Sequence, residues 1–250
     1  MITYKSPDQL ARMRRAGAII AKTMRLVAAE VKPGVSISDL DALAEELIRK
    51  EGGRPNFKGY KGYSHASCIS VNEVVVHGIP NGRVLNEGDI IGLDFGVEVE
   101  GFNADSAWTF PVGEIAPNAQ RLLNVTKEAL MQGLGKCKPG NRVGDISSTI
   151  QTYVEKNGYG IVRDLVGHGI GAKLHEEPSI PNFGKAKDGP MLKPGMTFCV
   201  EPMVNEGTWR VRTLDDDWTV VTADGKLSAH FEHTIAITAS GFEILTREED

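Results

Sequence analysis

The segment Lys32-Pro33-Gly34-Val35-Ser36-Ile37-Ser38-Asp39 has a second version later in the chain, Lys138-Pro139-Gly140-Asn141-Arg142-Val143-Gly144-Asp145. In both copies an aspartate follows the glycine of Lys-Pro-Gly by five positions, and the shift between residues 32 and 138 is 106 residues. A repeat over such a distance indicates an internal duplication, which would decide the fold of the whole chain.

Helical periodicity surrounds each copy. Apolar residues at helical spacing follow both copies, namely Leu40, Leu43, Leu47 and Ile48 in the first and Ile146, Ile150, Tyr153 and Val154 in the second. An amphipathic helix also precedes each copy. The first opens on the capping-box pattern Ser6-Pro7-Asp8-Gln9, and its counterpart should run from about Pro117 to Lys136.

The repeat continues beyond these helices. His77-Gly-Ile-Pro80 is echoed by His175-Glu-Glu-Pro178, and the segment from Leu85 to Asp94 is echoed by the segment from Leu192 to Glu201. Four elements in the same order favour a duplicated α+β unit. We expect one domain over residues 1–250, with pseudo-symmetric halves at about 5–112 and 113–246 that share a sheet.

Composition narrows the class of protein. The 250 residues are 41% hydrophobic and 24% charged, with a net charge of −5 and no Lys/Arg block, which argues against nucleic-acid binding as the main function. No stretch approaches the ~18 apolar residues of a membrane span. The scattered cysteines Cys68, Cys137 and Cys199 suit neither a disulfide framework nor a zinc ribbon, so we expect a cytoplasmic protein.

Four acidic residues stand where strands should be apolar. Asp94, Asp105, Glu201 and Glu232 lie within or beside segments rich in β-branched and aromatic residues. A carboxylate is almost never fully buried without a partner. Each residue alone could alternate outward into water, as we expect Glu98 to do. Four together favour convergence on a common centre.

A converging set of four carboxylates would carry four negative charges, and their flanking segments are nearly free of Arg and Lys. Two divalent ions would balance that charge. His168, in the Gly-rich turn Gly167-His-Gly-Ile-Gly171, would make a fifth ligand, although a lone histidine is more often structural. Oxygen ligands with one nitrogen favour Mn, Fe(II), Co or Zn.

Asp94 and Asp105 flank Glu100-Gly101 at a spacing that suits the two strands of one hairpin. Both side chains could then face one centre. Two metal ions ~3.5–4 Å apart lower the pKa of a bridging water. The residues therefore predict a hydrolase with two metal ions.

Longer motifs resemble the type I methionine aminopeptidases, which have the pita-bread fold, and the resemblance covers essentially the whole chain. It is carried by Ser70-Val-Asn-Glu-Val-Val-Val-His-Gly-Ile-Pro80, Asp89-Ile-Ile-Gly-Leu-Asp-Phe-Gly96, Gly167-His-Gly-Ile-Gly171, His175-Glu-Glu-Pro178, Glu201-Pro-Met203 and Ser228-Ala-His-Phe-Glu-His-Thr234. The resemblance implies a curved antiparallel sheet covered by two helix pairs, and removal of initiator methionine from nascent proteins and peptides whose second residue is small.

The resemblance also implies roles for single residues. Asp94 would chelate one metal ion, Asp105 and Glu232 would bridge both, and His168 and Glu201 would complete the other. His77 would contact the scissile amide and His175 the developing oxyanion, while Glu201 would relay the proton from the attacking water. The methionine pocket maps onto Tyr60, Tyr63, Cys68 and Trp218, with Phe57 and Leu174 beside them. A monovalent cation, Na or K, would lie near Asn72, Val74 and Ser228.

Two other functions fit the same fold. A proline-directed peptidase, such as aminopeptidase P or prolidase, would share the five ligands but usually has an additional N-terminal domain, for which the helix beginning near Ser6 leaves no room. A non-catalytic binding module is the other alternative, although all five ligand positions are present here. We expect a monomeric, bacterial-style minimal enzyme that acts on N-termini beginning with Met, with possible ribosome association and no membrane contact.

Overall fold

The computed structural model describes residues 1–247, and the last three residues of the predicted domain, 248–250, lie outside the described residues. The described chain contains the four predicted α-helices, which are α1 (Pro7–Ala28), α2 (Ile37–Lys50), α3 (Pro117–Leu134) and α4 (Val143–Lys156). Ser6 caps α1 as predicted, because its hydroxyl accepts a hydrogen bond from Gln9 N while the Gln9 side chain accepts one from Ser6 N.

The two Lys-Pro-Gly turns have the same hydrogen-bonding pattern. Gly34 N donates to Leu85 O at 2.8 Å, and Gly140 N donates to Leu192 O at 3.2 Å. Both glycines have a φ of 90°, which a residue with a side chain rarely adopts. The repeated segments thus make the same contacts in both halves, which supports the predicted duplication.

Every paired strand among the described residues is antiparallel. The first half contains β1 (Arg54–Pro55), the 3-10 turn η1 (Tyr60–Gly62), β2 (Ser67–Val71), β3 (Val74–Val76), β4 (Ile90–Val99) and β5 (Phe102–Pro111). The second contains β6 (Gly160–Ile161), β7 (Gly167–Gly169), β8 (Glu176–Ile180), β9 (Thr197–Val200), β10 (Met203–Asn205), β11 (Val211–Thr213), β12 (Val220–Thr222), β13 (Ser228–His230), β14 (His233–Ile237) and β15 (Phe242–Ile244).

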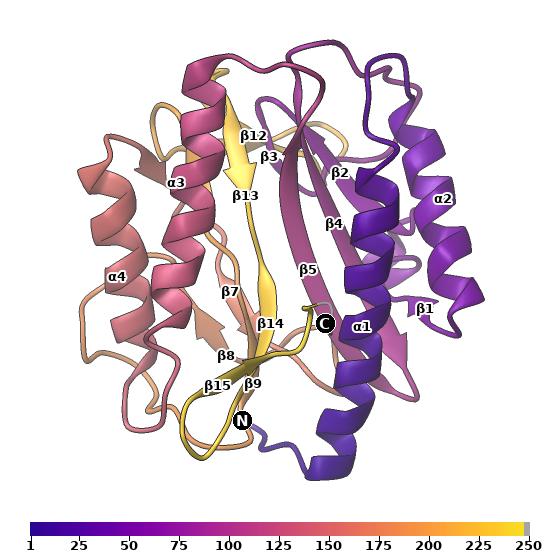
Figure 1. The fold of residues 1–250 in the computed structure, drawn as a ribbon. Coiled ribbons are helices and arrows are strands. Elements are labelled where there is room, and N and C mark those ends of the chain that lie inside the picture. The colour runs from indigo at the N-terminus through magenta and orange to yellow at the C-terminus, as the bar shows by residue number, and fades with distance from the viewer. Residues whose placement is uncertain (248–250) are drawn as a thin grey trace.

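These strands form a layer that is divided into four hydrogen-bonded sheets. β4 joins β1, β2 and β5, while β14 and β9 lie within a sheet that runs from β15 to β8. β12 belongs to the second half but pairs with β3 of the first. Figure 1 shows β5 beside β13 and β14, with the pair α1–α2 over the strands of the first half and the pair α3–α4 over those of the second.

We call the contact between β5 and residues 228–237 the seam, since it joins the two halves. Hydroxyl groups make much of it: Thr234 Oγ1 accepts from Asp105 N at 2.9 Å and donates to Asp105 O at 2.8 Å. Ser106 Oγ donates to Glu232 O at 2.6 Å, and Glu232 N donates to Ala107 O at 2.7 Å. Because side-chain hydroxyl groups make these hydrogen bonds in place of a regular backbone ladder, β5 and β14 belong to separate sheets.

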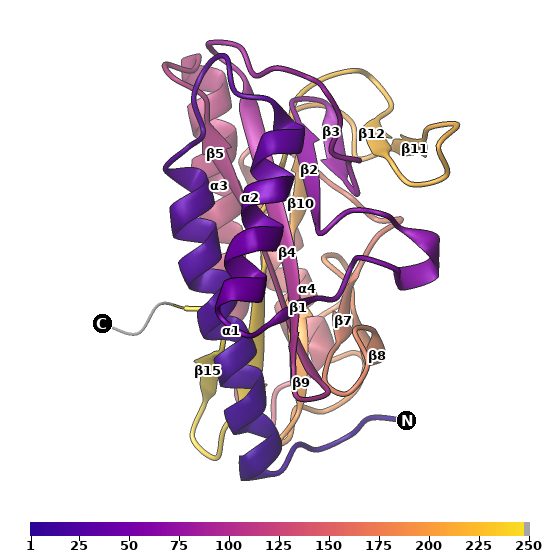
Figure 2. The ribbon, with the colours of Figure 1, turned by 90° about the vertical axis from the view of Figure 1, so that its right-hand side faces the viewer.

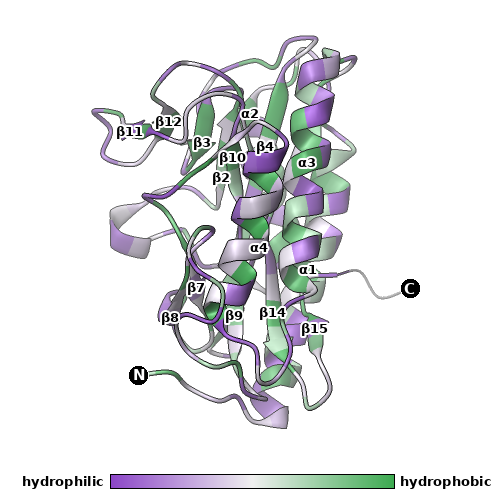
Figure 3. Ribbon diagram, turned by 90° about the vertical axis from the view of Figure 1, so that its left-hand side faces the viewer, coloured by the Kyte–Doolittle hydropathy of each residue, from purple (hydrophilic) through white to green (hydrophobic). Residues whose placement is uncertain are grey.

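Each half has its own hydrophobic core. Buried residues of α1 and α2 pack on β2, β4 and β5, whereas those of α3 and α4 pack on β9, β10, β13 and β14. Trp108 packs against both cores. The helices alternate hydrophilic and hydrophobic residues along their length, as Figure 3 shows for α3 and α4. Among the described residues, no helix is both long and apolar enough to cross a bilayer.

The helices leave one side of the strand layer to irregular chain. In Figure 2, α1 and α3 lie on one side of the strands, and β3, β7, β8, β11 and β12 lie on the other. The cavity described next opens among these short strands.

Candidate metal centre and substrate cavity

A cavity of about 220 Å³ is lined by every residue that the sequence suggested for the divalent ions, catalysis or substrate. Its walls include the five acidic or imidazole residues Asp94, Asp105, His168, Glu201 and Glu232, the helper histidines His77 and His175, and the pocket residues Phe57, Tyr60, Tyr63, Cys68, Leu174 and Trp218. The structure therefore brings all of them to one place, although their roles stay predictions.

The first half supplies its carboxylates from one continuous hairpin. Asp94 of β4 pairs with Ala107 of β5, and Asp105 lies two residues from Ala107, so both aspartates face the same side of the hairpin. The predicted hairpin across Glu100-Gly101 is confirmed. Glu98 lies near the surface and pairs with Arg54, as expected for an outward residue.

The second half supplies its carboxylates from breaks in strands, which the sequence interpretation missed. It placed Glu201 within a buried strand and Glu232 just before one. Glu201 instead follows the last residue of β9, and Glu232 lies between β13 and β14. Pro202 has no N–H to continue the ladder after Glu201. At Glu232 the backbone N–H turns across the seam to Ala107.

His168 lies in β7 between β8 and β9. Its glycine neighbours are needed for close approach: a Cβ at Gly167 would lie 2.4 Å from Cys199 O, and one at Gly169 would lie 2.2 Å from Glu177 O. His168 Nδ1 is 3.0 Å from Gly169 O, which leaves Nε2 to face the carboxylates. Nε2 is 3.9 Å from Asp105 Oδ2 and 3.7 Å from Glu201 Oε1.

Burial of the carboxylates leaves several of their oxygens without partners. Among the described residues, no group hydrogen-bonds Asp94 Oδ1, Asp105 Oδ1, Glu201 Oε1 or Glu232 Oε1. Burial raises the pKa of Asp94 to about 7, and this effect exceeds that of a hydrogen bond from Asp105, which lowers the pKa of Asp94. Burial, and then neighbouring carboxylates, raise the pKa values of Asp105, Glu201 and Glu232 well above the usual range.

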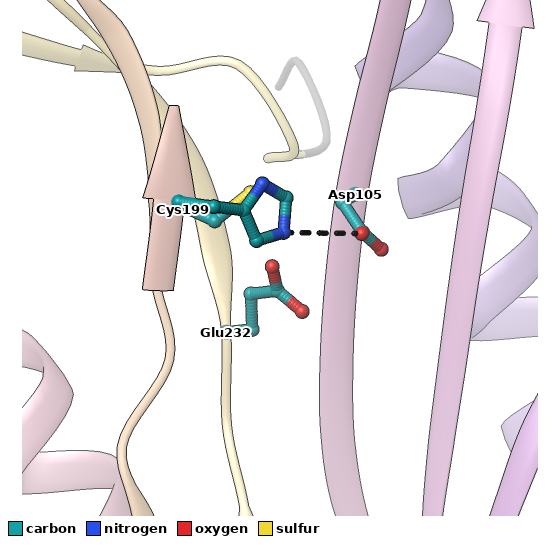
Figure 4. A group of neighbouring side chains, drawn as sticks. Asp105, Cys199 and Glu232 are labelled. Carbon is teal, nitrogen blue, oxygen red and sulfur yellow. Dashed lines mark ion pairs between the residues drawn. The ribbon is translucent and has the colours of Figure 1, made fainter. Parts of the chain in front are cut away.

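Four buried carboxyl groups with unpartnered oxygens are suited to divalent cations, because a cation supplies both the missing partner and the missing charge. Asp105, His168 and Glu232 each offer one ligand atom, and these atoms and Cys199 Sγ all lie within 4.8 Å of one another. Figure 4 shows Asp105, Cys199 and Glu232 pointing toward one another, with the dashed His168–Asp105 contact. The residues therefore fit a metal centre.

The helper histidines are neutral near pH 7. Burial, followed by the nearby charge of His168, lowers the pKa of His77, and burial lowers that of His175 to about 3. The ring of His175 lies 4.1 Å from that of His168 and 5.3 Å from that of Tyr60, between their centroids. His77 has a φ of 57°, a strained conformation that is most often found at functional sites.

The remaining wall is aromatic. The rings of Tyr63 and Trp218 are 4.9 Å apart, and Tyr63 Oη donates to Ser67 O at 2.9 Å. Burial raises the pKa of the Cys68 thiol well above its usual range, so this group is an uncharged, soft wall atom. These side chains make part of the cavity wall apolar, and Cys68 is the ladder partner of Asp94.

Two buried residues in the centre were missed from the sequence, Cys199 and His230. Cys199 lies two residues before Glu201, and His230 lies two residues before Glu232, so the period-2 rule for strands could have found both. Cys199 Sγ lies 3.4 Å from Thr234 Oγ1. Burial raises the pKa of the Cys199 thiol and lowers the pKa of His230 to about 3, so both groups are neutral near pH 7.

Comparison with known proteins identifies the family to which this chain belongs. The model of metallopeptidase family M24 matches residues 11–239. This chain belongs to metallopeptidase family M24. As a member of that family it is a metal-dependent peptidase, so the hydrolase predicted from the carboxylates and the peptidase activity implied by the resemblance are confirmed at that level.

Within family M24 the chain groups with methionine aminopeptidases. It is 54% identical to methionine aminopeptidase 1 of Bacillus subtilis, over 99% of this chain and 100% of the relative. It is 51% identical to the methionine aminopeptidase of Clostridium perfringens, over 98% and 99% of the two chains. The crystal structure of the Thermotoga maritima methionine aminopeptidase superposes with a TM-score of 0.98 at 46% identity, covering 99% of this chain and 100% of the other. The predicted pita-bread fold and family are confirmed.

A prolidase, which is a proline-directed peptidase, has the same fold but a longer chain. Prolidase from Pyrococcus furiosus has a TM-score of 0.80 at 22% identity, covering 99% of this chain but 66% of the prolidase. The alternative of a proline-directed peptidase is therefore not favoured over the methionine aminopeptidase.

Proposed function

We propose that this chain removes N-terminal methionine from peptides and nascent proteins whose second residue is small. The observation that carries the proposal is one cavity with an aromatic, sulfur-lined end beside a cluster of buried carboxylates. A methionine side chain is flexible and unbranched, and its thioether makes favourable contacts with aromatic rings. Tyr60, Tyr63, Cys68 and Trp218 would hold it, with Phe57 and Leu174 completing the wall.

Two divalent ions, from Mn, Fe(II), Co or Zn, fit the charge of the carboxylate cluster. Asp94, Asp105 and Glu232 would hold one ion, and Asp105, His168, Glu201 and Glu232 the other. When bound, such ions polarise a carbonyl group and make water a nucleophile near neutral pH. The unpartnered oxygens of Asp94, Asp105, Glu201 and Glu232 support this set.

The chain's own groups would handle substrate and protons. Neutral His77 would hydrogen-bond the scissile amide, and neutral His175 would donate to the oxygen on which negative charge develops. Glu201, which lines the cavity beside the other carboxylates, would take the proton of the attacking water and pass it to the leaving amine. The aromatic wall would fix the methionine end so that the scissile bond lies between these groups.

A monovalent cation near Asn72, Val74 and Ser228 is a further proposal. Ser228 N donates to Asn72 O at 2.9 Å, so these segments are adjacent, and Asn72 has a φ of 58°. Monomeric state, ribosome association and a cytoplasmic location also stay proposals, of which the last is supported by three unpaired buried cysteines.

Turnover of Met-Ala-Ser tests the proposed activity. The chelated protein should be inactive and should recover with Mn, Fe(II), Co or Zn, while Xaa-Pro peptides should not be cleaved. His77→Ala and Glu201→Ala should each abolish turnover of Met-Ala-Ser. Wild-type rates in either variant would refute the mechanism, and metal loading without turnover of any peptide would support the binding-module alternative.

A further inference from the structure

His230 is a buried imidazole in the centre that none of the proposed roles uses. It is the last residue of β13, its side chain is 6% exposed, and it lines the cavity. Among the described residues, no group hydrogen-bonds its Nε2 atom. Buried polar atoms are nearly always partnered, so an unpartnered nitrogen that faces a cavity points to a ligand.

The position of His230 matches that of His168. His230 Nε2 lies 3.8 Å from Glu201 Oε2 and 4.0 Å from Glu232 Oε2. His168 Nε2 lies 3.7 Å from Glu201 Oε1 and 3.9 Å from Asp105 Oδ2. The carboxylate of Glu201 thus has one imidazole nitrogen beside each of its oxygens.

The backbone of His230 is fixed at the seam. Its N–H donates to Thr109 Oγ1 at 3.0 Å, and its carbonyl oxygen accepts from Thr109 Oγ1 at 2.8 Å. β13 also pairs with β10, with His230 opposite Met203. A side chain on such a double-anchored backbone is preorganised, as a metal ligand must be.

We propose that His230 Nε2 is a sixth protein ligand of the metal centre, binding the ion on the Glu201 side together with His168. The inference rests on the proposed metal site. A neutral imidazole adds a donor atom without adding to the four negative charges already present. No bond within the protein is broken, because the nitrogen lone pair is unused.

A second imidazole changes which ion the site prefers. Carboxylate and water ligands suit Mg and Mn, whereas imidazole suits Zn, Fe and Ni. His230 therefore biases the centre toward borderline ions such as Zn and Fe(II) over Mn. A histidine that only filled space would not change the preference of the site among metal ions, so metal selectivity distinguishes the two roles.

Pulsed electron paramagnetic resonance of the protein loaded with one equivalent of Cu(II) counts coordinated imidazoles directly. The wild-type chain should show two, and His230→Gln should show one. His233→Gln is the matched control, because His233 is equally buried but its Nδ1 pairs with Thr246 Oγ1 at 2.8 Å outside the cavity. This control should still show two.

Competition between Zn and Mn gives the second readout. Loss of groups that only support a ligand typically lowers metal affinity 10–100-fold, so His230→Gln should lower Zn affinity by at least ~10-fold. Mn affinity should fall less, so the Zn-to-Mn affinity ratio decreases. The His233→Gln ratio should equal that of the wild type.

The outcomes separate this inference from the proposed site. A single imidazole in the wild-type spectrum that is lost in His168→Gln would overturn the role of His230 while the site stands. Two imidazoles that persist in His230→Gln would also overturn it. A wild-type spectrum without imidazole would refute the metal site itself. A wild-type count of one overturns the role of His230 even if His230→Gln does not fold, and after a count of two His230→Asn takes the place of a misfolded His230→Gln.

Discussion

The two halves of the chain share repeated segments, but different kinds of element carry their residues at the metal centre. The first half brings Asp94 and Asp105 on an uninterrupted hairpin of ten-residue strands. The second brings Glu201 and Glu232 from breaks in short strands, and it places imidazoles of β7 and β13 within 4.0 Å of carboxylate oxygens. The comparison teaches that the first half supplies its carboxylates from a continuous hairpin, whereas the breaks in the strands of the second half place its carboxylates next to imidazoles.

The largest expected effect comes from removing a carboxylate that both halves need. Asp105→Asn or Glu232→Gln should reduce turnover of Met-Ala-Ser by more than ~10²-fold, because losing even a supporting partner of a metal ligand costs 10–100-fold. Steady-state kinetics on the metal-reconstituted protein measures this. Glu98→Gln, on the same hairpin but outside the cavity, is the control and should keep wild-type rates.

The same carboxylates should make the metal-free protein sensitive to pH. The folded state raises the pKa of Asp94 from 3.8 to about 7, so between those values it binds more protons than the unfolded state. Relative to an Asp94→Asn variant, the chelated wild-type protein should therefore lose folding stability as pH rises from about 4 to 7, and added Mn should restore it. The comparison with Asp94→Asn cancels the opposite contribution of the buried histidines, whose lowered pKa values stabilise the folded state as pH rises. Thermal melts of both proteins at several pH values measure this. A stability difference between the two proteins that stays constant over this range would contradict the assignment.

The seam should contribute an intermediate effect. Thr234→Val removes a hydroxyl that bonds both Asp105 N and Asp105 O, and it leaves a buried N–H unpaired, which costs about 1–3 kcal/mol of unfolding free energy. Thr126→Val makes the same change within α3, where the hydroxyl only donates to Leu122 O, and should cost less. Urea denaturation of both variants compares them. Equal losses would mean that the seam is no more sensitive than a helix.

The smallest effect tests the equivalence of the halves. Gly34→Ala and Gly140→Ala place a Cβ at a φ of 90° in turns where no atom lies within 4 Å of it. Each should cost about 1 kcal/mol from backbone strain alone, and the two costs should agree. The denaturant midpoints of the two variants measure these costs. A large difference between the midpoints would show that the repeated turns are not equivalent.

Much of this architecture was visible in the sequence. The helices followed from apolar periodicity and from the Ser6 cap, and the hairpin carrying Asp94 and Asp105 followed from its spacing. These features depend on neighbours in the chain, which a sequence displays directly. The carboxylates stood out because burying charge is costly.

The rest depended on contacts between distant residues. The strands break at Glu201 and Glu232. At Glu232 the backbone N–H bonds Ala107 O across the seam, and no local sequence pattern predicts that partner. Cys199 and His230 were missed although each precedes a carboxylate by two residues, because a thiol or an imidazole in a strand is unremarkable on its own. The duplication predicted where the halves meet, but not that hydroxyl groups of Ser106, Thr109 and Thr234 would join them.

The central claim is that the two halves build one dinuclear centre that hydrolyses peptides. Native mass spectrometry during Co(II) titration, with turnover of Met-Ala-Ser followed on the same samples, tests it most directly. We predict that wild-type chains bind two ions, that Glu232→Gln chains bind fewer, and that turnover appears only in metal-loaded chains. Turnover that persists in fully chelated protein, or unchanged ion binding in Glu232→Gln, would contradict it.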